Sequence, residues 1–200
     1  MLKIKISSNI IKINNVFPSQ VIDKINKLFV NEKRWKYINQ VREKHYSHVF
    51  KSNSKLTPDQ NEIYYAKFYR CFDLEKNQKI IKNIEKYVLP LLKKHKITFK
   101  KIDIRCHKFK ENNFLRTHFD HYAGRYAINV NLNKKWKADW GGNLCILDGE
   151  KFENIQILVP EYNSINIMTS KRNKKKSPHF VTSVEKFAKE PRFSITIFLY

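Results

Sequence analysis

The sequence contains few of the residues that build flexible linkers and disulfide frameworks. Its 200 residues include only four glycines, and no stretch rich in Pro, Gly and Ser divides the chain, so flexible spacers between domains are not expected. Cys71, Cys106 and Cys145 are odd in number, far apart and without CxxC spacing. Neither a disulfide framework nor a zinc site is therefore indicated, and a reducing compartment is expected.

Long apolar runs are also missing. Lys3, Lys5 and Lys12 interrupt the first twenty residues, where a signal peptide would need an apolar core. No run approaches the roughly 18 apolar residues that span a bilayer. We therefore expect a soluble, cytoplasmic protein with no membrane association.

Acidic residues are scarce relative to basic ones. Lys and Arg number 40 and Asp and Glu number 18, which gives a net charge of +22. Such a field attracts nucleic acid, anionic surfaces or acidic substrates. An AT-rich coding sequence would also raise the content of Lys, Asn and Ile, but it would not reduce Asp and Glu. A polyanionic partner and a merely solvated basic surface both remain open.

The hydrophobic pattern changes from helical to β-type near residue 97. Residues 10–17 predict a short strand, and apolar residues at helical spacing follow Pro18 as far as Phe29. Residues 31–62 are polar and irregular, which predicts loop with short strands. Residues 75–97 predict the clearest helix, in which Pro90 should introduce a kink or end the first half. About eight short strands follow, at 97–109, 115–119, 125–132, 143–148, 155–159, 164–168, 179–184 and 192–200.

These elements predict an α+β fold in which a jelly-roll barrel carries N-terminal helices on one sheet. We expect a single domain over residues 1–200, with helical support and substrate-side loops in 1–97 and the barrel core in 98–200. Alternation in 126–132 assigns the faces of one strand. Tyr126, Ile128, Val130 and Leu132 should pack beneath the helices, while Ala127, Asn129 and Asn131 should face the barrel interior.

A possible metal site lies in the segment RTHFDHYAGRYAINVNLN, residues 116–133. His118 and Asp120 are two residues apart, so on a strand both point the same way and can reach one ion. Two imidazoles and a carboxylate form a facial triad that suits Fe(II). His179 is the best candidate for the third ligand. The alternative is a purely structural role, in which these residues form the polar side of an ordinary strand.

The last predicted strand offers a site for an acid. Arg192 and Ser194 lie on one face of RFSITIF, 13 residues after His179. A guanidinium and a hydroxyl on the same face can clamp a carboxylate through charge-assisted hydrogen bonds.

The ordered set of motifs resembles a known family. The set consists of HxD at 118–120, RYAINVNLNKKW at 125–136, WGGNLCIL at 140–147, HFVxxV at 179–184 and RFS at 192–194. It is similar to the core of the prolyl 4-hydroxylase-like 2-oxoglutarate/Fe(II)-dependent dioxygenases. The similarity covers roughly residues 100–200, and residues 10–29 resemble the strand and helix with which such proteins often begin. The family fold is a double-stranded β-helix, a jelly-roll or cupin-like barrel.

The resemblance implies a role for several residues. His118, Asp120 and His179 would ligate Fe(II), and Arg192 with Ser194 would hold the distal carboxylate of the cosubstrate 2-oxoglutarate. Asn131 stands where many prolyl hydroxylases have a Tyr that contacts the cosubstrate, so this contact differs here. Asn129 matches an Asn of lysyl hydroxylases and would bond the cosubstrate near the iron. O2 is the third reactant, and ascorbate is a further candidate cofactor.

The resemblance also sets the expected chemistry, because Asp120 occupies the carboxylate position that halogenating relatives lack. We expect hydroxylation of a C–H bond, first of all in a prolyl or other residue of a protein or peptide, with release of succinate and CO2. The same chemistry on a free amino acid, a small metabolite or a nucleobase is the alternative. A non-catalytic basic module that binds nucleic acid is the alternative from another class. The basic run KRNKKK, residues 171–176, is either a solvated loop or a guide for an acidic substrate.

Overall fold

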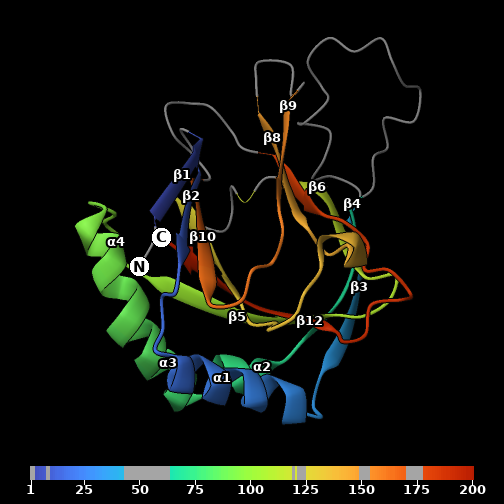
Figure 1. Cartoon of the computed structure of the whole chain (residues 1–200), viewed down its shortest axis with the longest axis horizontal. Coiled ribbons are helices and arrows are strands. Elements are labelled where there is room, and N and C mark those ends of the chain that lie inside the picture. The colour runs from blue at the N-terminus through green and yellow to red at the C-terminus, as the bar shows by residue number, and fades with distance from the viewer. Residues whose placement is uncertain are drawn as a thin grey trace.

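The computed structural model describes residues 3–7, 10–42, 64–118, 120, 125–148, 154–169 and 178–200 (Figure 1). The helical elements are α1(Ser19–Asn31), α2(Phe72–Glu75), α3(Gln78–Asn83), the π-helical turn η1(Ile84–Val88), α4(Leu89–Lys94) and the 3-10 turn η2(Ala138–Trp140). The strands are β1(Lys3–Ser7), β2(Ile10–Asn14), β3(Lys36–Arg42), β4(Tyr64–Arg70), β5(Ile102–Phe109), β6(Phe114–His118), β7(Tyr126–Asn131), β8(Leu144–Asp148), β9(Asn154–Leu158), β10(Ser164–Thr169), β11(His179–Val181) and β12(Arg192–Leu199).

The strands form one antiparallel ladder that curls into a barrel. Its order is β1-β2-β10-β7-β12-β5-β4-β6-β11-β8-β9, and β3 pairs with β4. One apolar cluster joins inward side chains of β2, β10, β7 and β12 to those of β8, β9 and β11, so the two halves of the ladder face each other. The members of this cluster include Ile10, Met168, Ala127, Phe198, Leu144, Ile146, Leu158 and Val181. The expected α+β jelly-roll barrel is confirmed.

The helices cover the outer face of the larger half of the sheet (Figure 1). Ile22, Ile25 and Phe29 of α1 pack with Ile80, Ile84, Val88 and Leu92 of the α3–α4 region against outward side chains of β5, β7, β10 and β12. Ile128, Val130 and Leu132 belong to this helix-side core, whereas Ala127 belongs to the barrel interior. The alternation read from residues 126–132 is therefore confirmed.

The helical region is interrupted next to Pro90, as the sequence predicts. It lies in the first turn of α4, directly after the π-helical turn η1. Because proline has no N–H and its ring crowds the preceding turn, the helical hydrogen-bond pattern shifts there. The helical region begins at Phe72 and ends at Lys94. Residues 95–97, which the sequence predicts to be helical, therefore lie outside the helix.

All eight strands expected after residue 97 are present, although the first begins at Ile102. β3 agrees with the short strands expected within 31–62, and residues 43–62 lie outside the described part of the chain. β4 is a strand that the sequence pattern does not predict, and it inserts between β5 and β6. The three cysteines are buried and unbridged. Within the described residues, no helix combines the length and apolar character that crossing a membrane requires.

Candidate active site

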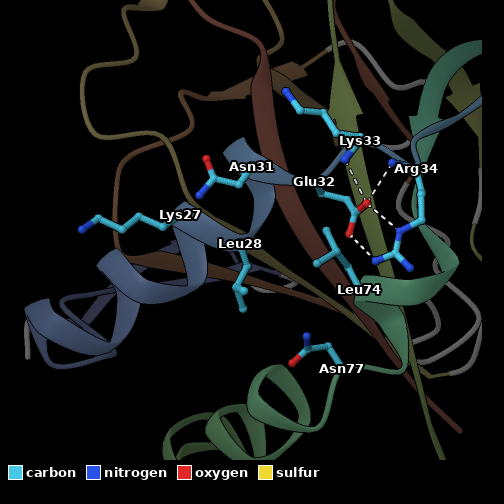
Figure 2. A pocket seen from close by; sticks show the side chains of 8 residues that line it. All are labelled: Lys27, Leu28, Asn31, Glu32, Lys33, Arg34, Leu74 and Asn77. Atoms are coloured by element: carbon cyan, nitrogen blue, oxygen red, sulfur yellow. Dashed lines mark hydrogen bonds and ion pairs between the residues drawn. The ribbon is translucent and has the colours of Figure 1, made fainter.

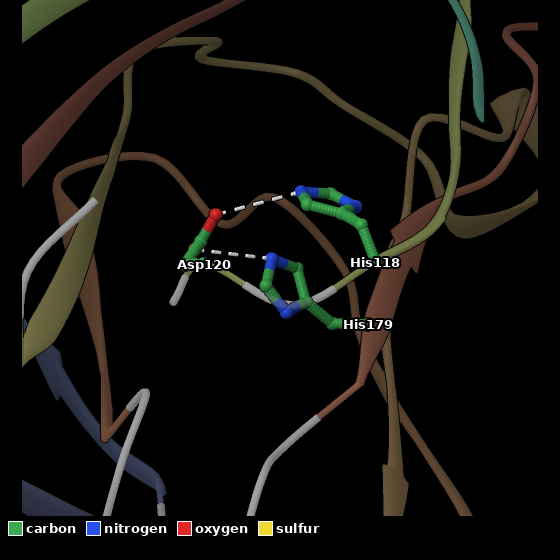
Figure 3. A group of neighbouring side chains, drawn as sticks. All are labelled: His118, Asp120 and His179. Carbon is green, nitrogen blue, oxygen red and sulfur yellow. Dashed lines mark ion pairs between the residues drawn. The ribbon is translucent and has the colours of Figure 1, made fainter. Parts of the chain in front are cut away.

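Two neighbouring strands of the smaller half of the barrel bring the three predicted metal ligands together. β6 ends at His118 and β11 begins at His179, and these two residues are direct partners in the antiparallel register. Asp120 follows β6 by two residues and turns back toward both imidazoles (Figure 3). The pairing explains how a ligand 61 residues downstream reaches the HxD segment.

The three side chains converge on one point. His118 Nε2 lies 3.6 Å from Asp120 Oδ1, and His179 Nε2 lies 3.3 Å from Asp120 Oδ2. One ligand atom from each residue lies within 4.8 Å of the other two, and these are the only residues that form such a group in the described part of the chain. The side chains are 7–17% exposed, so an ion bound there would be shielded from bulk water on most sides.

The ring of His118 is oriented by the backbone. Its Nδ1 lies 2.9 Å from the carbonyl oxygen of Arg116. A carbonyl only accepts hydrogen bonds, so with the proton on Nδ1 the ring donates to this oxygen and presents Nε2, on the side of Asp120, as the metal-ligating atom. A metal-binding His is commonly oriented in this way by an acceptor behind it.

The electrostatics favour the protonation states that a divalent cation needs. Burial, followed by the charge of His179, lowers the pKa of His118 to about 4. Burial alone would raise the pKa of Asp120, but the imidazoles of His179 and His118 outweigh it and lower that pKa to about 2. A neutral imidazole and an ionised carboxylate at neutral pH are ready to ligate without losing a proton.

Opposite the triad, the inner face of the larger half of the sheet is unusually polar. The register of five neighbouring strands, β2, β10, β7, β12 and β5, places one inward residue from each strand in a row, here called the polar row: Lys12, Asn166, Asn129, Thr196 and Arg105. A second inward row, here called the deep row, contains Asn14, Ser164, Asn131, Ser194, His107 and Arg70. Burying so many polar groups costs free energy unless they meet polar partners.

Several polar groups on this inner face, Arg192 beyond the deep row among them, have unpartnered atoms among the described residues. Arg192 is 1% exposed and its Nε makes no hydrogen bond there, and Ser194, also 1% exposed, has an unpartnered hydroxyl. Burial lowers the pKa of Arg192 to about 10, and its guanidinium sits 5.2 Å from the Phe109 ring centroid. A buried cation without a carboxylate partner, beside an unpartnered hydroxyl, fits the carboxylate of a bound ligand.

Two further residues hold Arg192 in place. Asn133 donates from Nδ2 to the carbonyl oxygen of Pro191 at 2.7 Å and accepts from the backbone N–H of Phe193 at 2.6 Å, so it brackets Arg192 on both sides. Gly142 has a φ of +61°, and a Cβ there would lie 3.0 Å from Arg192 Cδ. Neither positioning role is predicted from the sequence pattern, although Asn133 is the third Asn of NVNLN.

Asn131 faces the interior as expected, but its amide is already committed. Its Nδ2 donates to Ser164 Oγ at 3.0 Å, and that hydroxyl donates to the carbonyl oxygen of Glu161. Ser164 Oγ can therefore only accept from Asn131, which leaves Asn131 to present Oδ1 toward the interior. An acceptor cannot bind a carboxylate as a Tyr hydroxyl would. Asn129 also faces inward, with Oδ1 unpartnered among the described residues.

Other candidate residues have structural explanations. Arg70 forms a two-point ion pair with the nearly buried Glu75, at 2.6 and 2.9 Å. Trp140 is buried and packs edge-on against Trp136. His107 faces the barrel beside Thr196, and burial lowers its pKa to about 3.

A hollow on the helix side of the sheet is separate from the triad (Figure 2). It lies between the end of α1 and the α2–α3 turn. Arg34 there is paired with Glu32 and Asp73, and it lowers the pKa of Glu32 to about 2. The remaining lining residues are Lys27, Leu28, Asn31, Lys33, Leu74 and Asn77. The basic run 171–176 lies outside the described residues.

Comparison with known proteins agrees with this geometry. Residues 104–200 match the 2OG-Fe(II) oxygenase superfamily, where 2OG denotes 2-oxoglutarate. No curated protein sequence matches the chain. Among solved structures, a prolyl 4-hydroxylase of Pseudomonas putida is 11% identical with a TM-score of 0.62, covering 96% of this chain and 91% of its own.

Two further structures share the fold. A Trichoplax adhaerens prolyl hydroxylase, in complex with a peptide fragment of the hypoxia inducible factor oxygen degradation domain, is 15% identical with a TM-score of 0.68 and coverage of 97% and 84%. The viral collagen prolyl hydroxylase of Paramecium bursaria Chlorella virus-1 is 13% identical with a TM-score of 0.53 and coverage of 96% of each chain. With the converging His, Asp and His donors inside this barrel, the chain belongs to the 2OG-Fe(II) oxygenase superfamily, whose members use Fe(II), 2-oxoglutarate and O2, and it has the fold of the prolyl 4-hydroxylase-like enzymes.

Proposed function

We propose that this oxygenase hydroxylates a C–H bond in a prolyl or other residue of a protein or peptide, with release of succinate and CO2. The observation that carries the proposal is the pairing of two half-sites across the barrel. His118, Asp120 and His179 converge on one side, and the buried Arg192 and Ser194, whose Nε and Oγ have no partner among the described residues, lie on the other. A metal ion and a dicarboxylic acid are the ligands that these two groups would complement.

In this proposal each residue binds or orients. His118 through Nε2, His179 and one oxygen of Asp120 hold Fe(II), while the Arg116 carbonyl fixes the ring of His118. Arg192 and Ser194 hold the far carboxylate of 2-oxoglutarate, and Asn133 keeps Arg192 in register. The bound iron and 2-oxoglutarate supply the oxidising chemistry, and the protein aligns the substrate C–H bond with them.

A peptide substrate is supported by two observations. One structural neighbour is a prolyl hydroxylase in complex with a peptide fragment. In addition, the net charge of +22 favours encounter with an acidic protein segment. Nucleic acid has support from the charge alone, so we do not propose it as the substrate.

The test is turnover of synthetic peptides. Purified protein with Fe(II), 2-oxoglutarate, O2 and pools of proline-containing peptides should form succinate in step with a peptide mass gain of one oxygen atom. Asp120→Asn, which removes the charged ligand at nearly constant shape, should abolish both signals. Coupled turnover with pools of nucleotides, free amino acids or other metabolites, and none with peptides, would transfer the chemistry to a small-molecule substrate and refute the peptide assignment.

A further inference from the structure

Among the described residues, Arg70, Arg105 and Arg192 face the interior of the barrel, and their surroundings differ. Arg70 is neutralised by its two-point pair with Glu75, whose side chain is 9% exposed. Arg192 is fully buried and has no carboxylate partner among the described residues. Arg105 is one-third exposed, and its only carboxylate partner in the described chain is Asp103, also one-third exposed. Arg70 is 25% exposed but is held at two points by Glu75, so Arg105 is the partly exposed arginine that is paired through a single carboxylate oxygen.

The guanidinium of Arg105 is held in a fixed orientation with one edge unused. Its Nε and Nη2 both contact Asp103 Oδ2, at 3.0 and 2.9 Å. Its Cζ lies 4.6 Å from the centroid of the Phe198 ring, which supports the cation from a second direction. Within the described residues, no hydrogen bond engages Nη1. The Nη1–Nη2 edge can therefore still grip a carboxylate at two points.

Arg105 also lies away from Arg192, in the polar row on the inner face opposite the metal-binding group. Along β12, Arg105 is level with Thr196, four residues beyond Arg192 and hence roughly 13 Å away by strand rise. The two arginines are placed to serve two different anions.

We propose that Arg105 is a specificity-determining residue that binds an acidic group of the substrate inside the barrel, with Asp103 as its positioning residue. This inference rests on the proposed peptide hydroxylation and names the substrate class as acidic peptides.

The experiment compares two pools of proline-centred peptides that differ only in flanking Glu or Gln. Binding is measured without O2 to protein loaded with Fe(II) and 2-oxoglutarate, at low and at raised ionic strength. The wild type should bind the Glu pool roughly tenfold more tightly, as expected for one charge-assisted contact that is partly exposed. The preference should persist at raised ionic strength, where steering by distant lysines is screened.

Three variants identify the contact. Arg105→Gln should remove the Glu preference, and Arg105→Lys should retain part of it because the charge remains but the two-point fork is lost. Arg34→Gln removes an equal charge outside the barrel, in the hollow of Figure 2, and should keep the preference. Equal binding of the two pools by the wild type, an undiminished preference in Arg105→Gln, or failure of both pools to bind would overturn the proposal.

Two further measurements distinguish a substrate contact of Arg105 from a cosubstrate contact, and the Arg105 proposal from the proposed peptide hydroxylation. If Arg105→Gln weakens 2-oxoglutarate binding as strongly as loss of Arg192 does, Arg105 is a cosubstrate contact and the proposal fails. Admission of O2 then tests the chemistry on the same samples. A Glu peptide that binds through Arg105 but gains no oxygen refutes peptide hydroxylation and leaves the Arg105 contact standing.

Discussion

Replacement of Arg192 by Met should separate the cost of burying a cation from its use in binding. Arg192 is buried without a carboxylate partner among the described residues, and burial lowers its pKa from 12.5 to about 10. At about 1.4 kcal/mol per pKa unit, the charged form costs on the order of 3 kcal/mol in the ligand-free protein. The substitution also removes the contact of the guanidinium with the Phe109 ring, which costs about 1–2 kcal/mol and offsets part of this gain.

The net effect on the ligand-free protein is therefore a gain of roughly 1 kcal/mol, or about 2–4 °C in thermal midpoint for a chain of this size. Affinity for 2-oxoglutarate should fall at least a hundredfold, because two charge-assisted hydrogen bonds are each worth about 1.5–3 kcal/mol. Differential scanning fluorimetry with and without 2-oxoglutarate measures both effects. The cosubstrate-induced rise in midpoint should disappear in Arg192→Met.

Arg70→Met is the matched control on the same face of the barrel. This substitution leaves the nearly buried Glu75 without its ion-pair partner. Breaking such a pair typically costs about 3–5 kcal/mol, so the thermal midpoint should fall. The reasoning would be refuted if Arg192→Met destabilised the ligand-free protein as much as Arg70→Met, or if it still bound 2-oxoglutarate with unchanged affinity.

Three further predictions follow from other residues. Burial lowers the pKa of His107 from 6.5 to about 3, so its contribution to stability is full above about pH 6.5 and is lost as the pH falls toward 3. His107→Gln should therefore flatten the decline of the thermal midpoint between about pH 6.5 and 4. An unchanged pH profile of the midpoint would contradict this. Gly141→Ala should lower the free energy of unfolding by more than about 2 kcal/mol, because φ is +68° and the new Cβ would lie 1.9 Å from the Ser183 carbonyl oxygen. A near-neutral effect in thermal melts would count against the described turn. Ser194→Ala should weaken 2-oxoglutarate binding roughly tenfold in calorimetric titrations while preserving metal affinity, and a loss of metal binding would place Ser194 elsewhere in the site.

Features that depend on local pattern could be predicted from the sequence. Alternation in 126–132 assigned both faces of β7, and Pro90 marked the break in the helical region. His118 and Asp120 followed from their spacing, and His179 from its place before Arg192. The register pair between His118 and His179 supplies the physical link that spacing alone could only suggest.

Features that depend on which strands become neighbours could not be predicted. β4 has aromatic residues on both faces, so it lacks the alternation that marks a half-buried strand, and its insertion beside β5 is decided by tertiary packing. The inward role of Arg105 emerges only from its register with Thr196. The amide orientation of Asn131 depends on Ser164, 33 residues away in the chain, and the hydroxyl of that serine is itself committed to a backbone carbonyl.

The most direct test of the central claim is an anaerobic titration of the purified protein with Fe(II) and 2-oxoglutarate, followed by visible absorption. A weak charge-transfer band should appear in the wild type, disappear in His179→Ala and require much more 2-oxoglutarate in Arg192→Met. Absence of the band in folded wild-type protein, or its persistence in His179→Ala, would contradict the assignment of this barrel as an Fe(II)/2-oxoglutarate site.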